Sequence, residues 1–249
     1  MQRYFADYNS QENRFRITGD DCHHIARVMR MKEKEEILCV SEERKTALCS
    51  LTKISDDEVL ADVIQWMEES AEMPVDVTIV SGLPKGDKLE WIIQKGTELG
   101  AARFIPFTAA RSVVKWDEKK AEKKVSRWEK IAKEAAEQSH RAVIPQVLPP
   151  ISFQTLLRMG SQYDVKLIAY EDQARQGEKS VLAHALKGLK TGSTLLVVFG
   201  PEGGLTENEV KELEGNGFRA CGLGPRILRT ETAPLYLLSA VSYHLELLG

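Results

Sequence analysis

The stretch that most constrains the fold is residues 195–204, in which a short apolar run leads directly into a glycine-rich loop. Leu195–Phe199 is entirely apolar and ends at Gly200, the pattern of a buried strand. Thr206 and Glu209 follow with the spacing of a capping box, which opens a helix. The segment is therefore predicted to be a strand, a glycine loop and a helix. In an open α/β sheet such a loop lies at the carboxyl ends of the strands, where ligands bind.

The loop sequence, Gly-Pro-Glu-Gly-Gly, is not one of the common phosphate-binding motifs. It lacks the Gly-Lys-Ser/Thr ending of a P-loop and the Gly-x-Gly-x-x-Gly of dinucleotide-binding folds. A second segment, residues 222–234, repeats the arrangement between a strand expected at Phe218–Leu223 and a helix expected at Leu235–Leu248, which Thr230 or Thr232 could cap. Either loop alone can be explained as a tight turn, but together they predict that one ligand is held between them.

The residues of both loops resemble the RsmE family of bacterial methyltransferases, which belongs to the knotted SPOUT superfamily. The two loop segments that carry this resemblance are Gly200–Gly204 and Leu223–Ala233. Further segments that match the family, in the same order along nearly the whole chain, are His24 with Arg27–Arg30, Leu83–Asp87, Lys95–Gly100, Arg111–Val114, Glu134–Ser139 and Arg141. Met29 stands where the family usually has leucine, a substitution that conserves volume.

The resemblance implies two domains. Residues 1–72 would form a small PUA-like β-barrel that binds RNA, and residues 73–249 would form an α/β methyltransferase domain whose parallel sheet carries a deep trefoil knot. The sequence patterns agree, because short strands with polar turns suit a barrel and alternating strands and helices suit a parallel sheet. The elements expected in the first part are strands at Arg3–Phe5, Arg14–Ile17, Glu36–Val40, Ala47–Ile54 and Val59–Trp66, and a helix at Asp21–Met29. The elements expected in the second part are strands at Val75–Val80, Phe104–Phe107, Val165–Tyr170, Leu195–Phe199 and Phe218–Leu223, and helices near 87–99, 117–139, 179–189 and 206–214.

The net charge of −3 argues only weakly against a nucleic-acid partner, because the charge is unevenly distributed. Residues 1–34 hold seven Lys and Arg against five Asp and Glu, and residues 75–141 hold fourteen against ten. Residues 35–74 hold three against eleven. In the net charge, the acidic segment therefore offsets the positive charge of the two basic segments. An RNA-binding face is compatible with this composition.

Other classes of protein are disfavoured by what the sequence lacks. No apolar run reaches the roughly 18 residues of a membrane-spanning helix, and the N-terminus has no apolar signal region, so a cytoplasmic protein is expected. The four cysteines are scattered, without a Cys-x-x-Cys pair, and are expected to be reduced and buried. The five histidines are scattered as well, so no metal site is expected.

The resemblance implies S-adenosyl-L-methionine as cofactor and N3 of a uridine in 16S rRNA of the small ribosomal subunit as the methylated atom. Arg229 is the predicted catalytic residue, since it could stabilise negative charge developing on the uracil; its alternative role is a salt bridge, for example to Glu231. For Glu202, the alternative to cofactor contact is stabilisation by a helix N-terminus. No residue is singled out as a general base. The predicted cofactor-binding residues are Gly200, Glu202, Gly203, Gly204, Leu223, Gly224, Ile227, Leu228 and Thr232.

A third group of residues is predicted to bind RNA. Arg27 and Arg30 are three residues apart and would share one face of the helix expected at Asp21–Met29. The alternative for each arginine is a solvated side chain, and the lysine-rich helix near 117–139 is likewise best explained as a solvated face opposite an apolar stripe. The predicted RNA-binding residues are Arg3, Arg14, His24, Arg27, Arg30 and Arg111.

The last expected helix, Leu235–Leu248, is apolar nearly all round, so it must be buried on more than one side. A place in the core could explain this, and so could the homodimer that the resemblance implies. Two other functions stay open. One is a non-catalytic RNA-binding factor of ribosome assembly, against which the intact cofactor loops argue. The other is a SPOUT methyltransferase that acts on tRNA or on a 2′-hydroxyl, whereas the N-terminal segment and the Leu-Gly-Pro-Arg-Ile-Leu-Arg loop favour base modification.

Overall fold

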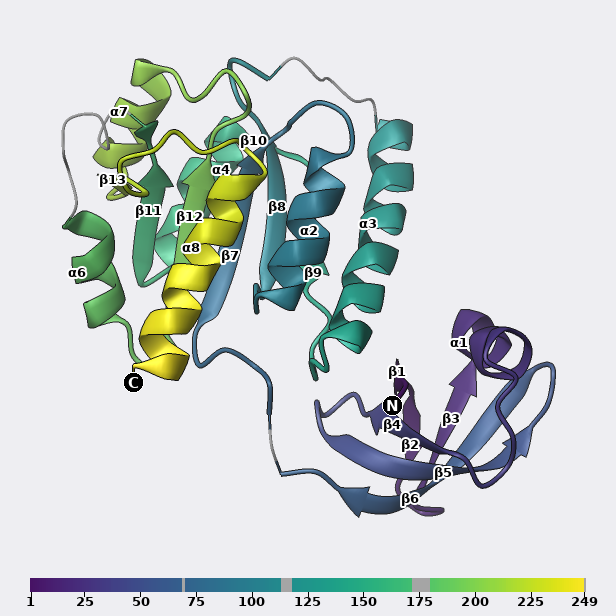
Figure 1. Ribbon diagram of the computed structural model, residues 1–249. Coiled ribbons are helices and arrows are strands. Elements are labelled where there is room, and N and C mark those ends of the chain that lie inside the picture. The colour runs from purple at the N-terminus through teal and green to yellow at the C-terminus, as the bar shows by residue number, and fades with distance from the viewer. Residues whose placement is uncertain (69, 113–117, 172–179, 249) are drawn as a thin grey trace. The chain divides into compact units, whose positions relative to one another are not determined.

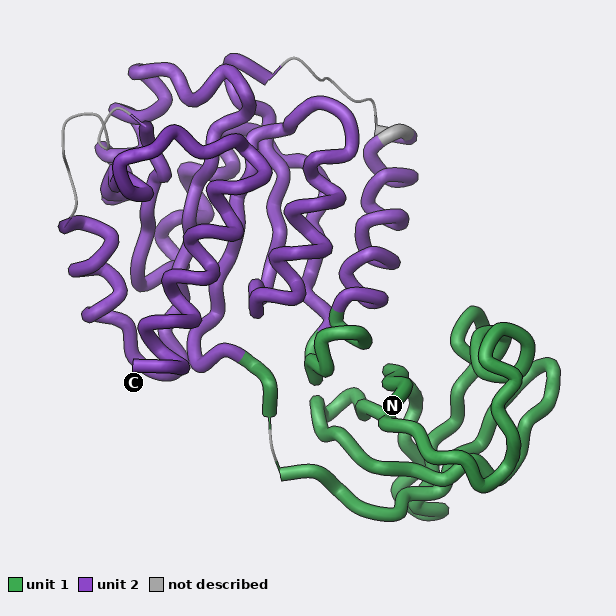
Figure 2. The backbone as a smooth tube through the Cα atoms, viewed as in Figure 1, with its two compact units in different colours: residues 1–72, 136–143 green, residues 73–135, 144–249 purple. Residues whose placement is uncertain are grey.

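The computed structural model describes residues 1–68, 70–112, 118–171 and 180–248 (Figure 1). The chain divides into two compact units (Figure 2): unit 1 consists of residues 1–72 with 136–143, and unit 2 of residues 73–135 and 144–249. Val113 and Val114, which belong to the segment Arg111–Val114 that resembles the family, lie outside the described residues. So do the first residues of the helices expected near 117–139 and 179–189.

Unit 1 is built on a curled six-stranded sheet with the strand order β1-β4-β5-β6-β3-β2. All neighbouring strands are antiparallel except the parallel pair β1 and β4. The sheet curls around a core that includes Tyr4, Phe15 and Ile37, and its pairing stops at β1 and β2, so the expected small barrel is a half-barrel. The strands are β1 (Arg3–Phe5), β2 (Asp7–Asn9), β3 (Arg14–Thr18), β4 (Glu36–Val40), β5 (Thr46–Ile54) and β6 (Glu58–Trp66).

The helical segment of unit 1 differs from its prediction. It begins as α1 (Gly19–His23) and continues as a π-helical turn, η1 (His24–Val28). Arg30 lies beyond the end of this segment, and its φ of +52° places it in the left-handed region. The expectation that Arg27 and Arg30 share a helical face is therefore wrong, because the chain reverses its backbone conformation between them.

Unit 2 contains a seven-stranded sheet in which every pairing is parallel, as the alternation of strands and helices predicted. The main path is β10-β8-β7-β12-β11-β13, and β9 pairs with β8. The strands β9 and β10 were not predicted, since two residues carry no periodic pattern. The strands are β7 (Asp76–Gly82), β8 (Arg103–Thr108), β9 (Gln146–Val147), β10 (Ile151–Ser152), β11 (Val165–Ala169), β12 (Thr194–Phe199) and β13 (Arg219–Cys221).

Helices cover both faces of this sheet (Figure 1). Along β12, Leu195 and Val197 pack into the core shared with α2 and α8, whereas Leu196 and Val198 pack into the core shared with α4 and α7. Burial on both faces explains why the sequence of such a strand is a continuous apolar run. The helical elements are α2 (Lys88–Glu98), α3 (Glu118–Gln138), α4 (Phe153–Met159), the 3₁₀ turn η2 (Gly160–Gln162), α6 (Val181–Gly188), α7 (Glu207–Gly215), α8 (Thr232–Ser242) and the π-helical turn η3 (Tyr243–Leu247).

The start of α8 corrects a second expectation. The helix begins at Thr232, earlier than expected, and Glu231 is its N-cap with no side-chain capping hydrogen bond. The predicted cap by Thr230 or Thr232 is therefore wrong; the turn is closed by the backbone N–H groups of Thr232 and Ala233, which donate to the carbonyl of Arg229. The trefoil knot that the resemblance implies stays a prediction.

Three further observations concern the described part of the chain. All four cysteines are buried as free thiols. Within the described ranges, no helix combines the length and the apolar character needed to cross a membrane. The same ranges contain no cluster of three or more His, Cys, Asp or Glu side chains that could hold a metal ion.

Candidate active site

A cleft of about 520 Å³ opens in unit 2 at the carboxyl ends of β11 and β12. Residues 169–171 line it where β11 ends, and residues 199–205 line it where β12 ends. A third wall is formed by residues 227–230, which precede α8, and the remaining lining residues are Lys88, Arg111, Glu207 and Ala233. This is the place at which an open parallel sheet binds its ligands.

The first glycine loop, residues 200–204, needs glycine for two different reasons. A Cβ atom on Gly200 would lie 2.9 Å from the carbonyl carbon of Gly204 and from the backbone nitrogen of Leu205, so the loop folds back onto this residue too closely for any side chain. Gly204 has a φ of +68°, which favours glycine. The loop therefore exposes its backbone to the cleft in a shape that other residues would not allow.

The capping box expected after this loop is confirmed. The Thr206 hydroxyl accepts a hydrogen bond from the backbone N–H of Glu209, and the Glu209 carboxylate accepts one from the backbone N–H of Thr206. The other oxygen of Glu209 accepts a hydrogen bond of 2.8 Å from the backbone N–H of Ala110. Glu209 is buried, so this carboxylate ties the start of α7 to the segment that follows β8.

Arg111 supports the same loop. Its guanidinium donates a hydrogen bond of 2.9 Å to the carbonyl oxygen of Gly203 and a longer one of 3.4 Å to that of Leu205. This arginine lines the cleft, but part of its hydrogen-bonding capacity holds the glycine loop. Its predicted contact with RNA would have to use the remaining donors.

A lysine that the sequence analysis did not single out lies between the two loops. One oxygen of Glu202 accepts hydrogen bonds from Lys88 Nζ at 2.8 Å and from the backbone N–H of Lys85 at 3.0 Å. The ammonium of Lys88 also lies 3.7 Å from the Glu231 carboxylate. Glu202 therefore forms an ion pair, in addition to accepting a backbone hydrogen bond just before α2. Glu231 lies near Lys88, and the salt bridge to Arg229 that had been considered for it is not observed among the described residues.

The ionisation of this pair follows from its surroundings. Burial raises the pKa of Glu202, but the hydrogen bonds from Lys88 and from backbone N–H groups outweigh burial and hold the pKa below its ordinary value. The hydrogen bond to Glu202 in turn raises the pKa of Lys88. Both groups are therefore charged throughout the neutral range.

The predicted cofactor-binding residues divide into two groups. Those that line the cleft are Gly200, Glu202, Gly203, Gly204, Ile227 and Leu228. The other three lie outside its lining: Leu223 packs against the core, Gly224 has a φ of +85°, and Thr232 begins α8. Arg229 lines the cleft and makes no ion pair with any residue of the described ranges.

Sequence reasoning missed several residues of the lining, among them Lys88, Tyr170, Glu171 and Glu207. Of these four residues, only Lys88 could have been identified from the sequence. It is the first residue of α2, where the helix dipole disfavours a cation, so a tertiary carboxylate partner could have been expected.

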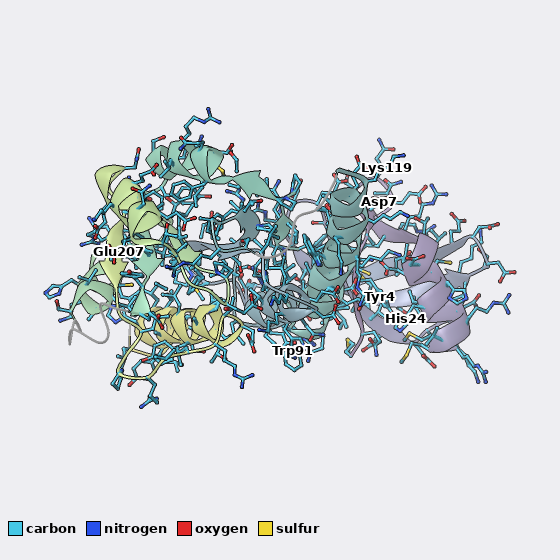
Figure 3. The ribbon with its side chains drawn as sticks, turned by 90° about the horizontal axis from the view of Figure 1, so that it is seen from above. Tyr4, Asp7, His24, Trp91, Lys119 and Glu207 are labelled. Atoms are coloured by element: carbon cyan, nitrogen blue, oxygen red, sulfur yellow. The ribbon has the colours of Figure 1, made fainter. Side chains whose placement is uncertain are left out.

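Most of the cationic side chains predicted to bind RNA in unit 1 have partners within that unit. Arg3 is buried and donates to the carbonyl oxygen of Arg141 at 2.8 Å. Arg14 pairs with Asp62, and Arg27 pairs with Asp56. Tyr4 and His24 form a hydrogen bond of 3.0 Å and lie side by side in Figure 3. Arg30 is exposed and pairs with none of the side chains that the structure describes.

Comparison with known proteins decides the family. Residues 71–242 match the model of the RNA methyltransferase domain, and residues 17–64 match that of the RNA methyltransferase PUA domain. A Bacillus subtilis protein named ribosomal RNA small subunit methyltransferase E is 57% identical, with 100% of this chain and 98% of that protein covered. The chain belongs to the RsmE family. The family resemblance found in the sequence is thereby confirmed.

Two solved structures of similar chains contain S-adenosyl methionine. The Neisseria gonorrhoeae ribosomal RNA small subunit methyltransferase E, bound to S-adenosyl methionine, has a TM-score of 0.83 at 28% identity, with 97% of each chain covered. A methyltransferase from Legionella pneumophila in complex with the same cofactor has a TM-score of 0.83 at 27% identity, with 96% of each chain covered. The similarity to both structures extends over nearly the whole of this chain.

Proposed function

We propose that this protein transfers a methyl group from S-adenosylmethionine to N3 of a uridine in 16S rRNA of the small ribosomal subunit. The observation that carries the proposal is the cleft in which two glycine-containing loops and Arg229 converge at the carboxyl ends of a parallel sheet. Membership of the RsmE family supports the reaction class. Such a substrate would be met in the cytoplasm.

The residues of the cleft fit this cofactor. Because Gly200 has no side chain, the first glycine loop can fold back on itself and line the cleft with residues 200–204, whose main-chain groups can then approach a ligand closely. Glu171 and Glu207 belong to the same lining and can provide negative charge near a cationic ligand, whereas Glu202 is paired with Lys88. The cofactor supplies an activated methyl group on its sulfonium, and the protein supplies position and electrostatics.

Arg229 is the residue proposed to act on the uracil. The proton of N3 is released to water, so negative charge develops on the uracil ring; N3 then forms a bond to the methyl carbon while the bond from that carbon to the sulfonium sulfur breaks and its electrons stay on sulfur. A guanidinium held in the cleft stabilises that charge. Arg229 suits this role because it lines the cleft and is not neutralised by a carboxylate in the described part of the structure.

The reaction is tested by mapping methylation of 16S rRNA by mass spectrometry, with and without the protein. The expected result is one N3-methylated uridine that depends on the protein and on the cofactor. A methyl group on a ribose 2′-hydroxyl or on tRNA would contradict the proposal in favour of another SPOUT activity. RNA binding without any methyl transfer would favour a non-catalytic assembly factor.

We further propose that unit 1 binds the RNA while unit 2 binds the cofactor. The structure narrows the candidate contacts, because Arg3 is buried and Arg14 and Arg27 are paired with carboxylates. Arg30 remains as an exposed cation, next to the exposed apolar side chains of Val28 and Met29. A free cation beside apolar surface is well suited to contact a phosphate and an adjoining nucleotide.

Replacing Arg30 by alanine should weaken RNA binding and lower the salt slope of the binding constant by about one, the value of a single phosphate contact. Arg44→Ala is the matched control, because Arg44 is an exposed arginine of the same unit that lies beside Glu42 and Glu43. The measurement is a set of binding isotherms with an rRNA fragment at several salt concentrations. Equal salt slopes for Arg30→Ala and the unmodified protein would contradict the contact.

Unit 2 presents an apolar surface that suits a homodimer. Leu247 and Leu248, at the end of the last helical segment, are 73% and 63% exposed. Trp91, on the helix α2 that packs against α8, is 60% exposed and points away from the ribbon in Figure 3. Soluble monomers rarely expose so many large apolar side chains, so a second copy of the chain is the proposed partner for the surface around the last helical segment.

Leu247→Lys should convert the dimer to a monomer or to aggregates, because it places a charge in the proposed apolar contact. Leu245 would be a poor choice for this test, since it is half-buried against the core. Ile64→Lys, at an exposed apolar position of unit 1, is the control that should leave assembly unchanged. Light scattering at micromolar concentration is the measurement, and an unmodified protein that runs as a monomer would contradict the dimer.

A further inference from the structure

Lys88 connects the two loops that line the cleft. Its ammonium donates a hydrogen bond of 2.8 Å to Glu202 of the first glycine loop and lies 3.7 Å from Glu231, the residue immediately before α8. All three side chains are partly shielded from water, with exposed fractions of 34% for Lys88, 31% for Glu202 and 25% for Glu231. A charged pair in such a setting is screened less than one at the surface.

Lys88 forms a hydrogen bond with Glu202 but only a longer ionic contact with Glu231. The contact with Glu202 is a hydrogen bond, and the backbone N–H of Lys85 reinforces it on the same oxygen. In the contact with Glu231, the facing oxygen, Oε2, is buried and accepts no hydrogen bond from the described residues. A buried oxygen without a donor is costly. Shortening the Lys88–Glu231 separation from 3.7 Å to the 2.8 Å seen with Glu202 would remove that cost.

Movement of Glu231 toward Lys88 would also move the wall of the cleft. Residues 227–230 line the cleft and precede Glu231 directly, and the carbonyl of Arg229 accepts the hydrogen bonds that start α8. The positive charge of Arg229 is close enough to Lys88 to lower its pKa, against the larger raising effect of Glu202. Glu231 follows Arg229 by two residues in the same loop, so a movement of Glu231 toward Lys88 would also move Arg229.

We propose that Lys88 is a positioning residue for cofactor binding, which holds Glu202 in place and completes its contact with Glu231 when S-adenosylmethionine enters the cleft. The inference rests on the proposed function and deepens it, because it names the residue that couples the two loops. Lys88 acts through the loops, and its contribution to catalysis is the placement of Arg229.

The first test compares Lys88→Met with Lys88→Arg in calorimetric titrations with S-adenosylmethionine. Lys88→Met should raise the dissociation constant about tenfold or more, the value of one lost hydrogen bond to a charged group. Lys88→Arg keeps the charge and can reach two carboxylates, so it should stay within about threefold of the unmodified protein. Lys119→Met is the matched control, an exposed lysine on α3 labelled in Figure 3, and it should leave the dissociation constant unchanged.

The second test is a double-mutant cycle with Glu231→Gln. This substitution should weaken cofactor binding in the unmodified background and have little further effect in Lys88→Met, because the two groups act as a pair. In methylation assays, Lys88→Met should raise the KM for the cofactor and leave the KM for RNA unchanged.

The results of these tests distinguish failure of the role proposed for Lys88 from failure of the proposed function. A Lys88→Met variant with the unmodified thermal midpoint and an unchanged dissociation constant would overturn the role of Lys88, as would equal effects of Glu231→Gln in both backgrounds. If Lys88→Met does not fold, Lys88→Arg with Glu231→Gln provides the same comparison. Failure of the unmodified protein to bind S-adenosylmethionine would overturn the proposed function itself.

Discussion

Replacing Gly200 by alanine is expected to weaken S-adenosylmethionine binding by about 5- to 150-fold. The new Cβ would lie 2.9 Å from two backbone atoms, the carbonyl carbon of Gly204 and the nitrogen of Leu205, and neither can rotate away. The loop cannot shift freely, because Glu209 and Arg111 hold it from the neighbouring segment. Overpacking of this kind costs about 1–3 kcal/mol, and the strain falls on the backbone that is proposed to face the ligand.

The matched control is Gly188→Ala, at the end of α6, where an added Cβ would have no heavy atom within 4 Å. Both variants should unfold cooperatively, so calorimetric titration of the folded proteins isolates the effect on binding. Cofactor affinity in Gly200→Ala equal to that of the control would show that the first glycine loop does not form the cofactor site.

The parts of the fold that the sequence predicts well are those encoded by neighbouring residues. The strand expected at Leu195–Phe199 is observed at Thr194–Phe199, because a strand buried on both faces is apolar at every position. The capping box is observed because both of its partners lie within one turn. Strands β2, β9 and β10 were missed because two or three residues carry no measurable period.

The parts that could not be predicted depend on contacts between distant residues. Lys88 and Glu202 are 114 residues apart, and only the fold brings them together. Arg3 looked like an RNA ligand because a lone arginine is usually exposed, yet the fold buries it against the carbonyl of Arg141, 138 residues away. Arg30 does not share a helical face with Arg27 because its backbone enters the left-handed region, which no local pattern signals for arginine.

The candidate site, like the fold, was predicted where it depends on neighbouring residues and not where it depends on the orientation of side chains. Sequence patterns locate the two loops, and the structure shows that both contribute to one cleft. They do not distinguish side chains that face the cleft from those that face the core: the side chain of Leu223 packs against the core, and the cofactor contact predicted for its backbone groups stays a prediction. A loop has no periodicity from which the direction of a side chain could be deduced.

Replacing Arg229 by alanine is expected to slow single-turnover methylation by about 100-fold or more, the usual loss for one donor that stabilises charge in the transition state. The affinities for the cofactor and for RNA should stay nearly the same. The carbonyl of Arg229, which accepts the first hydrogen bonds of α8, is kept in the variant, so the second loop should retain its structure. Arg229→Lys should recover only part of the rate, because a lysine lacks the planar fork of an arginine.

Arg226→Ala is the control for this experiment, since Arg226 is an exposed arginine of the same loop that lies outside the lining of the cleft. Single-turnover rates measured beside RNA-binding isotherms separate a defect in chemistry from a defect in binding. If Arg229 acts on the uracil, its loss changes the rate constant at saturating RNA, whereas loss of Arg30 changes the RNA concentration that saturates the enzyme. A loss of RNA affinity in Arg229→Ala as large as that in Arg30→Ala, with no selective defect in rate, would show that Arg229 is a phosphate contact and that the chemistry lies with another residue.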